Sequence, residues 1–260
     1  MINNQRVAVV LPAYNAEHTL ALTVSHLDRS VVDDIIVVDD GSTDGTVDVA
    51  RNLGLDIITH ATNRGYGANQ KTCYRAALAQ GADVIIMLHP DYQYSPELIP
   101  ALAAMLAYAP FELVLGSRIL AQSAVKSGMP VYKFVANRVL TAIENLLVGA
   151  KLSEYHTGLR GYRRGLLEAV PFHLNSDDFV FDNQFILQAL AAGARVGELS
   201  CPTHYGDESS SINFRRSVMY GLGVLRAALE FRLAALGVVR PPYLAAVQRL
   251  PREEHGATPQ

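Results

Sequence analysis

Cysteine is scarce in this sequence of 260 residues, which contains only Cys73 and Cys201. Two cysteines so far apart form neither a ligand-spaced metal cluster nor a disulfide framework. Long apolar runs are lacking as well, since none reaches the roughly 18 to 20 residues that a membrane span needs. The longest candidate, residues 98–109, instead predicts a helix that packs on a core.

An excess of one charge sign is also lacking. The formal net charge is −3, which argues against a general nucleic-acid binder. No signal peptide is recognisable, because the first residues, MINNQRVAVV, enter a strand pattern directly. We therefore expect a cytoplasmic protein, and contact with the inner face of a membrane stays open.

Strand and helix patterns alternate through the first half of the chain. Such alternation predicts an α/β fold with a mostly parallel sheet and helices on both faces. We expect one domain over residues 1–236, which ends in a helix over 214–236, and a partly disordered tail over 237–260. Expected strands are 7–11, 35–38, 56–59, 84–88, 113–115 and 195–199; expected helices are 17–27, 43–53, 67–80, 95–108, 130–147 and 181–192; and 156–162 is expected to be a loop.

The most informative segment is VVDDGSTDGT, residues 37–46. A buried strand pattern ends there in Asp39 and Asp40, and ligands of open α/β sheets bind at the carboxyl ends of strands. Two adjacent carboxylates can accept hydrogen bonds from a ribose or a base. The alternative is an acidic turn in which Ser42 or Asp44 caps the next helix and no ligand binds.

The first strand ends in LPAYNAE, residues 11–17. Pro12 stops the strand ladder, and Tyr14 offers a flat face on which a base could stack. Asn15 and Glu17 place polar groups at the mouth of the same site. Taken alone, this segment is better explained as an ordinary strand-to-helix turn.

A third polar loop, NRGYGANQK, covers residues 63–71. Gly65 and Gly67 free the backbone at a helix start, where a phosphate or a base edge could approach, and Lys71 supplies positive charge. The segment is neither a Walker loop nor a G-x-G-x-x-G motif, so its signal is weak by itself.

The fourth strand is followed by HPDYQ, residues 89–93. His89, Asp91 and Gln93 alternate, so in an extended conformation they share one face. An imidazole, a carboxylate and an amide oxygen could together hold a divalent cation, Mg²⁺ or Mn²⁺, that bridges a diphosphate. The alternative is a strand-end turn with Ser95 as a helix cap.

These four segments occur in this order on successive strands, and as a set they are specific. Over roughly Arg6 to Leu236 the chain resembles the inverting family 2 glycosyltransferases with the Rossmann-like GT-A fold. It is similar in particular to the catalytic domain of polyprenyl (dolichyl) phosphate mannose or glucose synthases. Further matches are GSR at 116–118, the T-G-x-x-G-Y-R run at 157–163, and FVFDNQFILQALAAGARVGEL at 179–199.

The resemblance assigns roles to individual residues. It implies transfer of a sugar from a nucleoside-diphosphate sugar to an acceptor, and Asp91 and Gln93 correspond to the last carboxylate of the D-x-D motif and the amide that follows it. The expected nucleotide-sugar site contains Pro12, Tyr14, Asn15, Glu17, Asp39, Asp40, Gly65, Lys71 and Asp91; the expected metal ligands are His89, Asp91 and Gln93; and the expected catalytic residues are Arg118 near the diphosphate, Asp182 as base and Asp178 as second choice.

The chain departs from the family pattern at several positions. His89 stands at the first carboxylate of D-x-D, and Gln184 replaces a glutamate and cannot act as a base. Ala16 occupies the usual glutamate position after the Tyr-Asn pair, with Glu17 as the substitute. The membrane spans that follow the catalytic domain in many relatives are not expected here.

The acceptor decides whether a base is needed. A hydroxyl acceptor requires one, whereas a lipid phosphate is already anionic, and Gln184 fits the second case better. Two other hypotheses stay open: a sugar-nucleotide-binding protein without turnover, because of His89 and Gln184, and a nucleotidyltransferase. The latter is disfavoured because no glycine-rich loop with Arg or Lys follows the first strand.

A strongly amphipathic segment lies near the end of the chain. It carries one apolar stripe at helical spacing and is flanked by arginines, which could bind an anionic membrane surface. The alternative is a helix that packs on the core or on a second subunit. The stripe consists of Phe214, Val218, Leu222, Leu225, Leu229, Leu233 and Leu236, and the arginines beside it are Arg215, Arg226 and Arg232.

Overall fold

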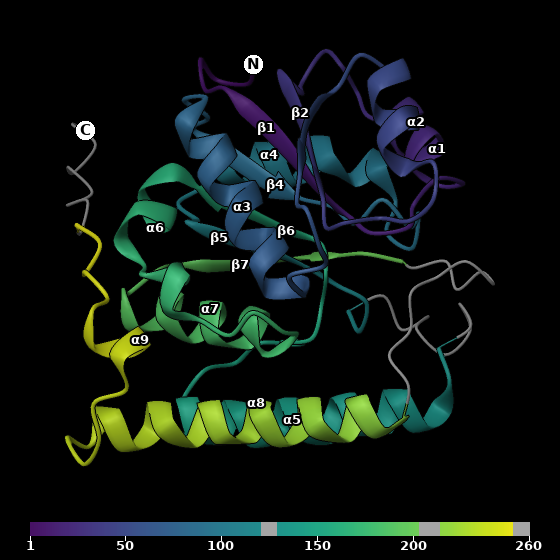
Figure 1. Cartoon of the computed structure of the whole chain (residues 1–260). Coiled ribbons are helices and arrows are strands. Elements are labelled where there is room, and N and C mark those ends of the chain that lie inside the picture. Colours follow the sequence, from purple (N-terminus) through teal and green to yellow (C-terminus); the bar gives the residue numbers. More distant parts are fainter. Residues whose placement is uncertain (121–128, 203–213, 252–260) are drawn as a thin grey trace, which may run out of the picture.

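The computed structural model describes residues 1–120, 129–202 and 214–251. Its centre is one sheet of seven strands in the order β3-β2-β1-β4-β6-β5-β7, with helices on both faces (Figure 1). The predicted α/β fold with a mostly parallel sheet is confirmed. The strands are β1 (Val7–Ala13), β2 (Asp34–Asp39), β3 (Asp56–Thr59), β4 (Val84–Met87), β5 (Leu113–Ser117), β6 (Arg160–Arg163) and β7 (Val196–Ser200).

Helices join the strands much as the alternating pattern predicts. Gly65 precedes α3 with φ +103°, a left-handed conformation that glycine tolerates and that side chains of other residues disfavour. The helices are α1 (Leu20–Ser25), α2 (Thr46–Asn52), α3 (Tyr66–Ala79), α4 (Ile99–Tyr108), α5 (Val131–Val148), α6 (Arg164–Ala169), α7 (Val180–Ala191), α8 (Phe214–Ala235) and α9 (Pro242–Ala245), with 3₁₀ turns at Pro96–Leu98 and Phe172–Leu174.

The central strands are apolar throughout because both faces of the sheet are covered. Val10 and Ile36 belong to one core, together with Tyr74 of α3 and Phe185 of α7. Their sequence neighbours, such as Val9, point to the other core, which α1, α2 and α4 close. Burial of each such apolar side chain contributes about 1.5 to 3 kcal/mol. This packing holds the strand ends, and therefore the loops that follow them, in fixed positions.

One sequence expectation is wrong. Residues 156–162 were expected to form a loop, but Arg160–Arg163 is strand β6, which runs antiparallel between β4 and β5. The glycine that suggested a loop has a packing role, because a Cβ on Gly161 would lie 2.6 Å from Cδ1 of Leu106 in α4. Glycine therefore lets helix and strand approach closely here instead of ending the strand.

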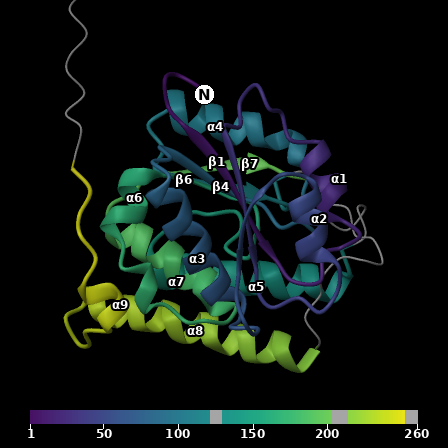
Figure 2. The same cartoon turned by 45° about the horizontal axis from the view of Figure 1, so that its top comes forward.

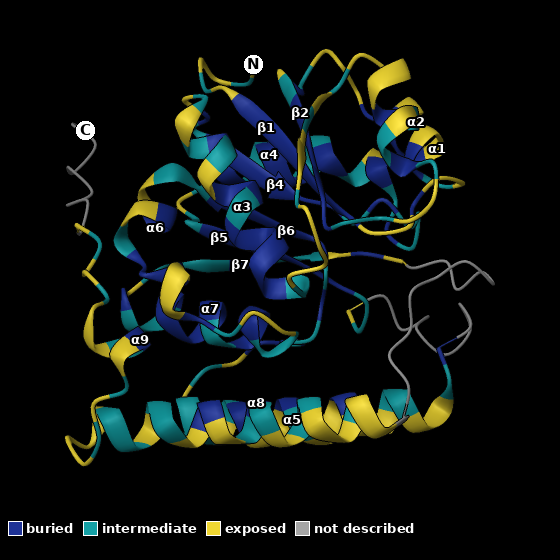
Figure 3. Cartoon of the chain, viewed as in Figure 1, coloured by how far each residue is buried: buried dark blue, intermediate teal, exposed yellow. Residues whose placement is uncertain are grey.

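Helices α5 and α8 lie side by side along one edge of the molecule in both Figure 1 and Figure 2. We call this pair the helix platform. Exposed positions run along both of its helices (Figure 3). None of the helices within the described ranges is long and apolar enough to cross a membrane. The exposed large apolar residues of the platform and its end are Val131, Tyr132, Val135, Val139, Ile143, Leu146, Val218, Met219, Leu222, Leu229, Leu236 and Val238.

The predicted apolar stripe of α8 faces outward for most of its length. Leu222 is 59% exposed and Leu229 48% exposed. The helix packs inward through a different set of small residues, among them Ala227 and Ala228, which are buried. The side chain of Phe214, at the start of the stripe, lies outside the described part. Packing on the core of this chain therefore does not account for the stripe.

The tail was expected to be partly disordered from residue 237 onward. Residues 237–251 pack on the domain through α9, where Tyr243 is buried. The backbone amides of Gln248 and Leu250 donate to the carbonyls of Ala169 and Ala192, at 2.9 Å each. Residues 252–260 lie outside the described part of the chain.

Candidate active site

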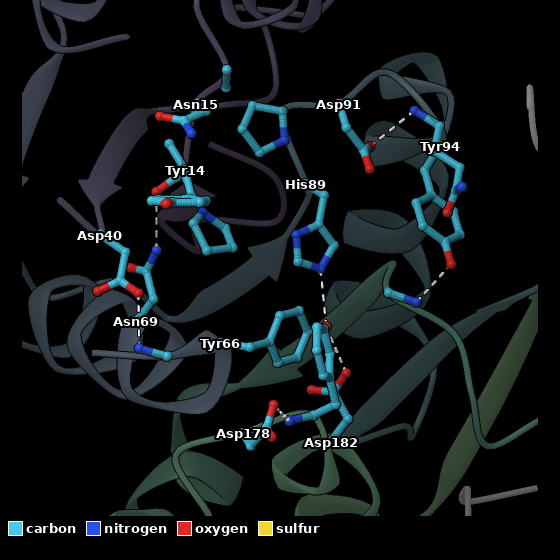
Figure 4. Close-up of a pocket in the computed structure, with 18 of the residues that line it drawn as sticks. Tyr14, Asn15, Asp40, Tyr66, Asn69, His89, Asp91, Tyr94, Asp178 and Asp182 are labelled. Carbon is cyan, nitrogen blue, oxygen red and sulfur yellow. Dashed lines mark hydrogen bonds between the residues drawn. The ribbon is translucent and has the colours of Figure 1, made fainter. Parts of the chain in front are cut away.

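A cavity of about 450 Å³ opens at the carboxyl ends of β1, β2 and β4. This size is typical of small-ligand sites, and the position is the one that open α/β sheets use for ligands. Figure 4 shows the side chains that converge on it from both halves of the chain. Eleven of the predicted site residues line it: Pro12, Tyr14, Asn15, Asp40, Gly65, His89, Asp91, Gln93, Arg118, Asp178 and Asp182.

Three predicted residues, Glu17, Asp39 and Lys71, do not line this cavity. The carboxylate of Glu17 accepts a hydrogen bond from the amide of Gly45 at the start of α2, at 3.0 Å. Asp39 is buried and accepts from the amides of Gly41 and Ser42 through Oδ2, whereas Oδ1 has no hydrogen-bond partner among the described residues. Both carboxylates thus stabilise the loop after β2.

Lys71 of α3 holds the segment that precedes α7. Its Nζ donates to Oδ1 of Asp177 at 2.7 Å and to the carbonyl of Asn175. The amide of Gly67 donates to the carbonyl of Asp177 at 2.7 Å. A Cβ on Gly67 would meet the carbonyl of Ser176 at 2.4 Å, so glycine permits this contact. Residues 176 and 177 therefore occupy part of the helix start, where a phosphate or a base edge was expected to approach.

Asp40 holds the loop after β3. Its Oδ1 accepts hydrogen bonds from Nδ1 of His60 at 2.7 Å and the amide of Arg64 at 3.0 Å. Its Oδ2 accepts from the amide of Gly65 at 2.9 Å. The carboxylate is 3% exposed but lines the cavity edge. It therefore shapes the wall between the loops, in addition to any contact with a ligand.

Tyr14 and Asn69 form the open end of the cavity near β1. The Tyr14 ring is 52% exposed, so its face is available for stacking. Asn69 of α3 donates through Nδ2 to the carbonyls of Ala13 and Val38, at 3.3 and 3.1 Å. Asn69 thereby ties α3 to the ends of β1 and β2, and Figure 4 shows it below Tyr14.

Asp182 lies at the floor of the cavity and is held by three protein groups. Its Oδ1 lies 2.8 Å from Nη1 of Arg160 and accepts from Nε2 of Gln70 at 2.9 Å. Its Oδ2 accepts from the Tyr66 hydroxyl at 2.7 Å. Arg160 is fully buried. Burial alone would lower the pKa of Arg160, but the Asp182 carboxylate raises it above its ordinary value.

Two of the three predicted metal ligands, His89 and Asp91, contact other groups of the protein. Asp91 accepts a hydrogen bond from the amide of Gln93 at 3.0 Å, and Figure 4 shows its carboxylate on the side of Tyr94. The His89 ring turns toward Tyr66, with Nε2 3.1 Å from its hydroxyl. Within the described residues, no three His, Cys, Asp or Glu side chains are grouped as metal ligands. Asp91 alone still fits a Mg²⁺ or Mn²⁺ site, because such ions often take one carboxylate together with substrate phosphates.

Arg118 enters the cavity from the end of β5. Its Nε donates to Oε1 of Glu154 at 2.8 Å, and its backbone amide donates to Oε2 at 2.8 Å. Burial alone would raise the pKa of Glu154, but the charge of Arg118 and its hydrogen bonds hold it below the ordinary value. A buried, ionised partner thus fixes the guanidinium at the cavity wall.

Helix α8 of the platform closes the cavity on the side of Asp178. Arg216 and Tyr220 line it. The Arg216 guanidinium lies 3.8 Å from Oδ1 of Asp178 and 5.4 Å from the ring centroid of Phe179. The Tyr220 hydroxyl lies 2.9 Å from Nδ1 of His156. One helix therefore contributes both to the cavity wall and to the exposed apolar surface.

Sequence reasoning missed several residues that build the site. They include Tyr66, Asn69, Arg160, His156, Arg216 and Tyr220. Arg160 could have been suspected, since an arginine in a run with the apolar character of a strand needs a buried partner. Tyr66 and Asn69 lie in the loop that contains Gly65 and Gly67, but their side chains were not singled out there. His156, Arg216 and Tyr220 come from distant segments, for which spacing gives no signal.

Comparison with known proteins agrees with this geometry. The family described as Glycosyl transferase family 2 matches residues 8–170. The chain is 26% identical over 244 residues, 87% of this chain and 96% of the other, to the UDP-N-acetylglucosamine–dolichyl-phosphate N-acetylglucosaminyltransferase of Methanococcus voltae. It is 27% identical over 201 residues, 75% and 82% of the two chains, to the undecaprenyl-phosphate mannosyltransferase of Micrococcus luteus.

A solved structure shares the fold. The glucosyl-3-phosphoglycerate synthase of Mycobacterium tuberculosis, in complex with Mn²⁺, uridine diphosphate and glucosyl-3-phosphoglycerate, superposes with a TM-score of 0.66. The alignment covers 91% of this chain and 82% of the other at 19% identity, which supports the GT-A fold alone. Since the family match spans most of the chain, this protein belongs to glycosyl transferase family 2 and is a glycosyltransferase.

Proposed function

We propose that this protein transfers a sugar, with inversion, from a nucleoside-diphosphate sugar to a polyprenyl phosphate at a membrane surface. The observation that carries the proposal is the double role of α8. Its inner face brings Arg216 and Tyr220 to the cavity, while Leu222 and Leu229 are exposed on the outer side. A lipid-linked acceptor needs an enzyme whose cavity lies beside a surface that can contact lipid.

The platform has the composition of a surface that lies on a membrane. Its exposed apolar side chains could enter the boundary between headgroups and acyl chains. Arg215, Arg226 and Arg232 are exposed on α8 and could contact anionic headgroups. Each basic residue near such a surface contributes roughly 1 kcal/mol, and salt weakens the effect.

The reaction needs no general base with this acceptor. A phosphate oxygen of the lipid attacks the anomeric carbon, the new C–O bond forms, and the bond to the diphosphate breaks on the opposite side. The acceptor brings a negative charge and gives up no proton. Asp182 fits this chemistry, because its oxygens already accept hydrogen bonds from Tyr66 and Gln70 and form an ion pair with Arg160. Gln184 is likewise engaged, accepting from the amide of Ser176 at 2.7 Å.

The donor is expected to lie between Tyr14 and Arg118. Tyr14 offers its exposed face to the base, and Asp40 forms the neighbouring edge. A divalent cation bound through Asp91 would neutralise charge on the diphosphate as it leaves. Arg118, held by Glu154, supplies a second positive charge at the cavity wall.

The names of the relatives support the acceptor class. Two of them act with dolichyl phosphate or undecaprenyl phosphate, and the family match favours a transferase over binding without turnover or nucleotidyl transfer.

The test compares a short-chain polyprenyl phosphate with the matching polyprenyl alcohol, using UDP-glucose, UDP-N-acetylglucosamine and GDP-mannose as donors. We expect release of nucleoside diphosphate with the phosphate and not with the alcohol. Equal rates with the alcohol would contradict a reaction without a base.

A further inference from the structure

His89 is joined to the floor of the cavity through a chain of polar contacts. Its Nε2 lies 3.1 Å from the Tyr66 hydroxyl, and that hydroxyl donates to Oδ2 of Asp182 at 2.7 Å. A tyrosine hydroxyl has one proton. Because Asp182 receives it, the contact with His89 must be donated by the imidazole. The geometry therefore requires a proton on Nε2 of His89.

The ion pair between Asp182 and Arg160 decides which group donates in each of these polar contacts. Arg160 is buried and lies 2.8 Å from Oδ1 of Asp182, so the carboxylate neutralises a buried positive charge and acts as an acceptor. Burial, and then the charge of Asp182, raises the pKa of Tyr66 well above its ordinary value, which keeps the hydroxyl protonated.

The other ring nitrogen, Nδ1, faces the cavity. A Cβ placed on Gly158 would lie 2.9 Å from Cδ2 and 3.3 Å from Nε2 of His89, so this edge of the ring rests on Gly158. Nδ1 is on the opposite edge. Figure 4 shows it on the side of Tyr14 and Asn69, away from the carboxylate of Asp91.

We propose that Tyr66 and Asp182 are positioning residues that hold the His89 ring with its proton on Nε2 and its Nδ1 toward the cavity, so that Nδ1 accepts a hydrogen bond from a hydroxyl of the nucleotide-sugar donor. This inference rests on the proposed function and deepens it. A carboxylate at position 89 would also accept such a bond, but would add negative charge beside a diphosphate. Imidazole supplies the acceptor without that charge, and Asp91 remains the carboxylate for the cation.

The first test reads the tautomer directly in the free protein. Nitrogen chemical shifts of ¹⁵N-histidine-labelled protein at neutral pH should show His89 protonated on Nε2 alone. Tyr66→Phe keeps the ring that stacks on His89, with centroids 5.4 Å apart, but removes the hydroxyl. We expect this variant to show a mixture of tautomers. Tyr243→Phe is the matched control, because the Tyr243 hydroxyl donates to Oε2 of Glu230 in α8 and Tyr243 does not line the cavity.

The second test measures binding. With whichever of UDP-glucose and GDP-mannose binds the wild type, His89→Leu and Tyr66→Phe should each weaken donor binding about three- to tenfold, the range for one hydrogen bond. Mn²⁺ binding, followed by the electron paramagnetic resonance signal of the free ion, should be nearly unchanged in His89→Leu and at least about tenfold weaker in Asp91→Ala.

Three results would overturn the proposal. The first is wild-type His89 protonated on Nδ1 or on both nitrogens. The second is a tautomer that does not change in Tyr66→Phe. The third is Mn²⁺ binding that falls as much in His89→Leu as in Asp91→Ala, which would make His89 a metal ligand. If neither of these donors nor UDP-N-acetylglucosamine binds the wild type, the proposed function is at fault, whereas the nitrogen shifts still decide the proton arrangement.

Discussion

Arg160 and Asp182 form an ion pair beneath the cavity, with Nη1 2.8 Å from Oδ1 and the arginine fully buried. Removal of one partner from such a pair leaves an uncompensated charge in the interior. Asp182, which the sequence analysis gives as a candidate base, therefore also stabilises the fold. Its loss would affect folding as well as turnover, and the two effects need separate measurements.

Asp182→Asn should lower the free energy of unfolding by about 3 to 5 kcal/mol, since the Arg160 charge would then be buried without its partner. Urea denaturation followed by circular dichroism measures this. Glu168→Gln is the control, because Glu168 pairs with Arg164 at the surface and should change stability by less than about 1 kcal/mol. Similar small losses in both variants would show that the Asp182 site is solvated in solution.

Asp40→Asn should loosen the loop over residues 60–65, because three donors lose a charged acceptor. We expect donor affinity to fall by about 1 to 3 kcal/mol, the range for an interaction with a buried charged group. Hydrogen exchange at Arg64 and Gly65 should accelerate in the same variant. Slow exchange at both amides, together with full donor affinity, would mean that Asp40 neither holds the loop nor contacts the donor.

Removal of divalent cations should abolish transfer. A chelator such as EDTA should stop release of nucleoside diphosphate, and Mn²⁺ or Mg²⁺ should restore it, because the leaving diphosphate needs a counter-charge. Asp91→Ala should remain inactive at cation concentrations that saturate the wild type. Full activity in EDTA would show that the reaction needs no divalent cation, and Asp91 would then have no role as a metal ligand.

Membrane contact should depend on the outer side of the platform. The wild type should co-sediment with anionic liposomes at low salt and dissociate at high salt. Arg215→Glu with Arg232→Glu, or Leu222→Gln with Val139→Gln, should reduce binding while hydrolysis of the donor continues. Arg216 is left intact because it lines the cavity.

Leu22→Gln on α1 is the matched control, since Leu22 is 45% exposed but lies away from the platform. It should bind liposomes as the wild type does. If the platform variants also bind normally, the exposed stripe serves another purpose, such as contact with a second subunit.

Much of the fold follows from local pattern. Strands such as Asp34–Asp39 were expected within a residue or two, because buried strands are continuous apolar runs with polar residues at their ends. Strand β6 was missed because Gly161 resembles a loop signal, and only the approach of Leu106 from α4 explains the glycine. Its antiparallel direction depends on long-range pairing, which no local pattern encodes.

The site was predictable where a strand end carries its own chemistry. Tyr14, Asp40 and Asp91 follow β1, β2 and β4 and line the cavity as expected. Lys71 was misplaced because a positive charge near a helix start resembles a phosphate contact, whereas the partner, Asp177, is 106 residues away. The chain of contacts from Arg160 to His89 joins four segments, so its existence depends on tertiary packing.

The most direct test of the account uses vesicles that contain anionic lipid and a polyprenyl phosphate. Radiolabelled sugar from the donor that the protein binds should pass into the lipid phase, with one nucleoside diphosphate released for each sugar transferred. The lipid product should have the inverted anomeric configuration. The Leu222→Gln, Val139→Gln variant should form this product more slowly, and Leu22→Gln should match the wild type. Transfer to a soluble acceptor at full rate, with no label in the lipid phase, would contradict the account.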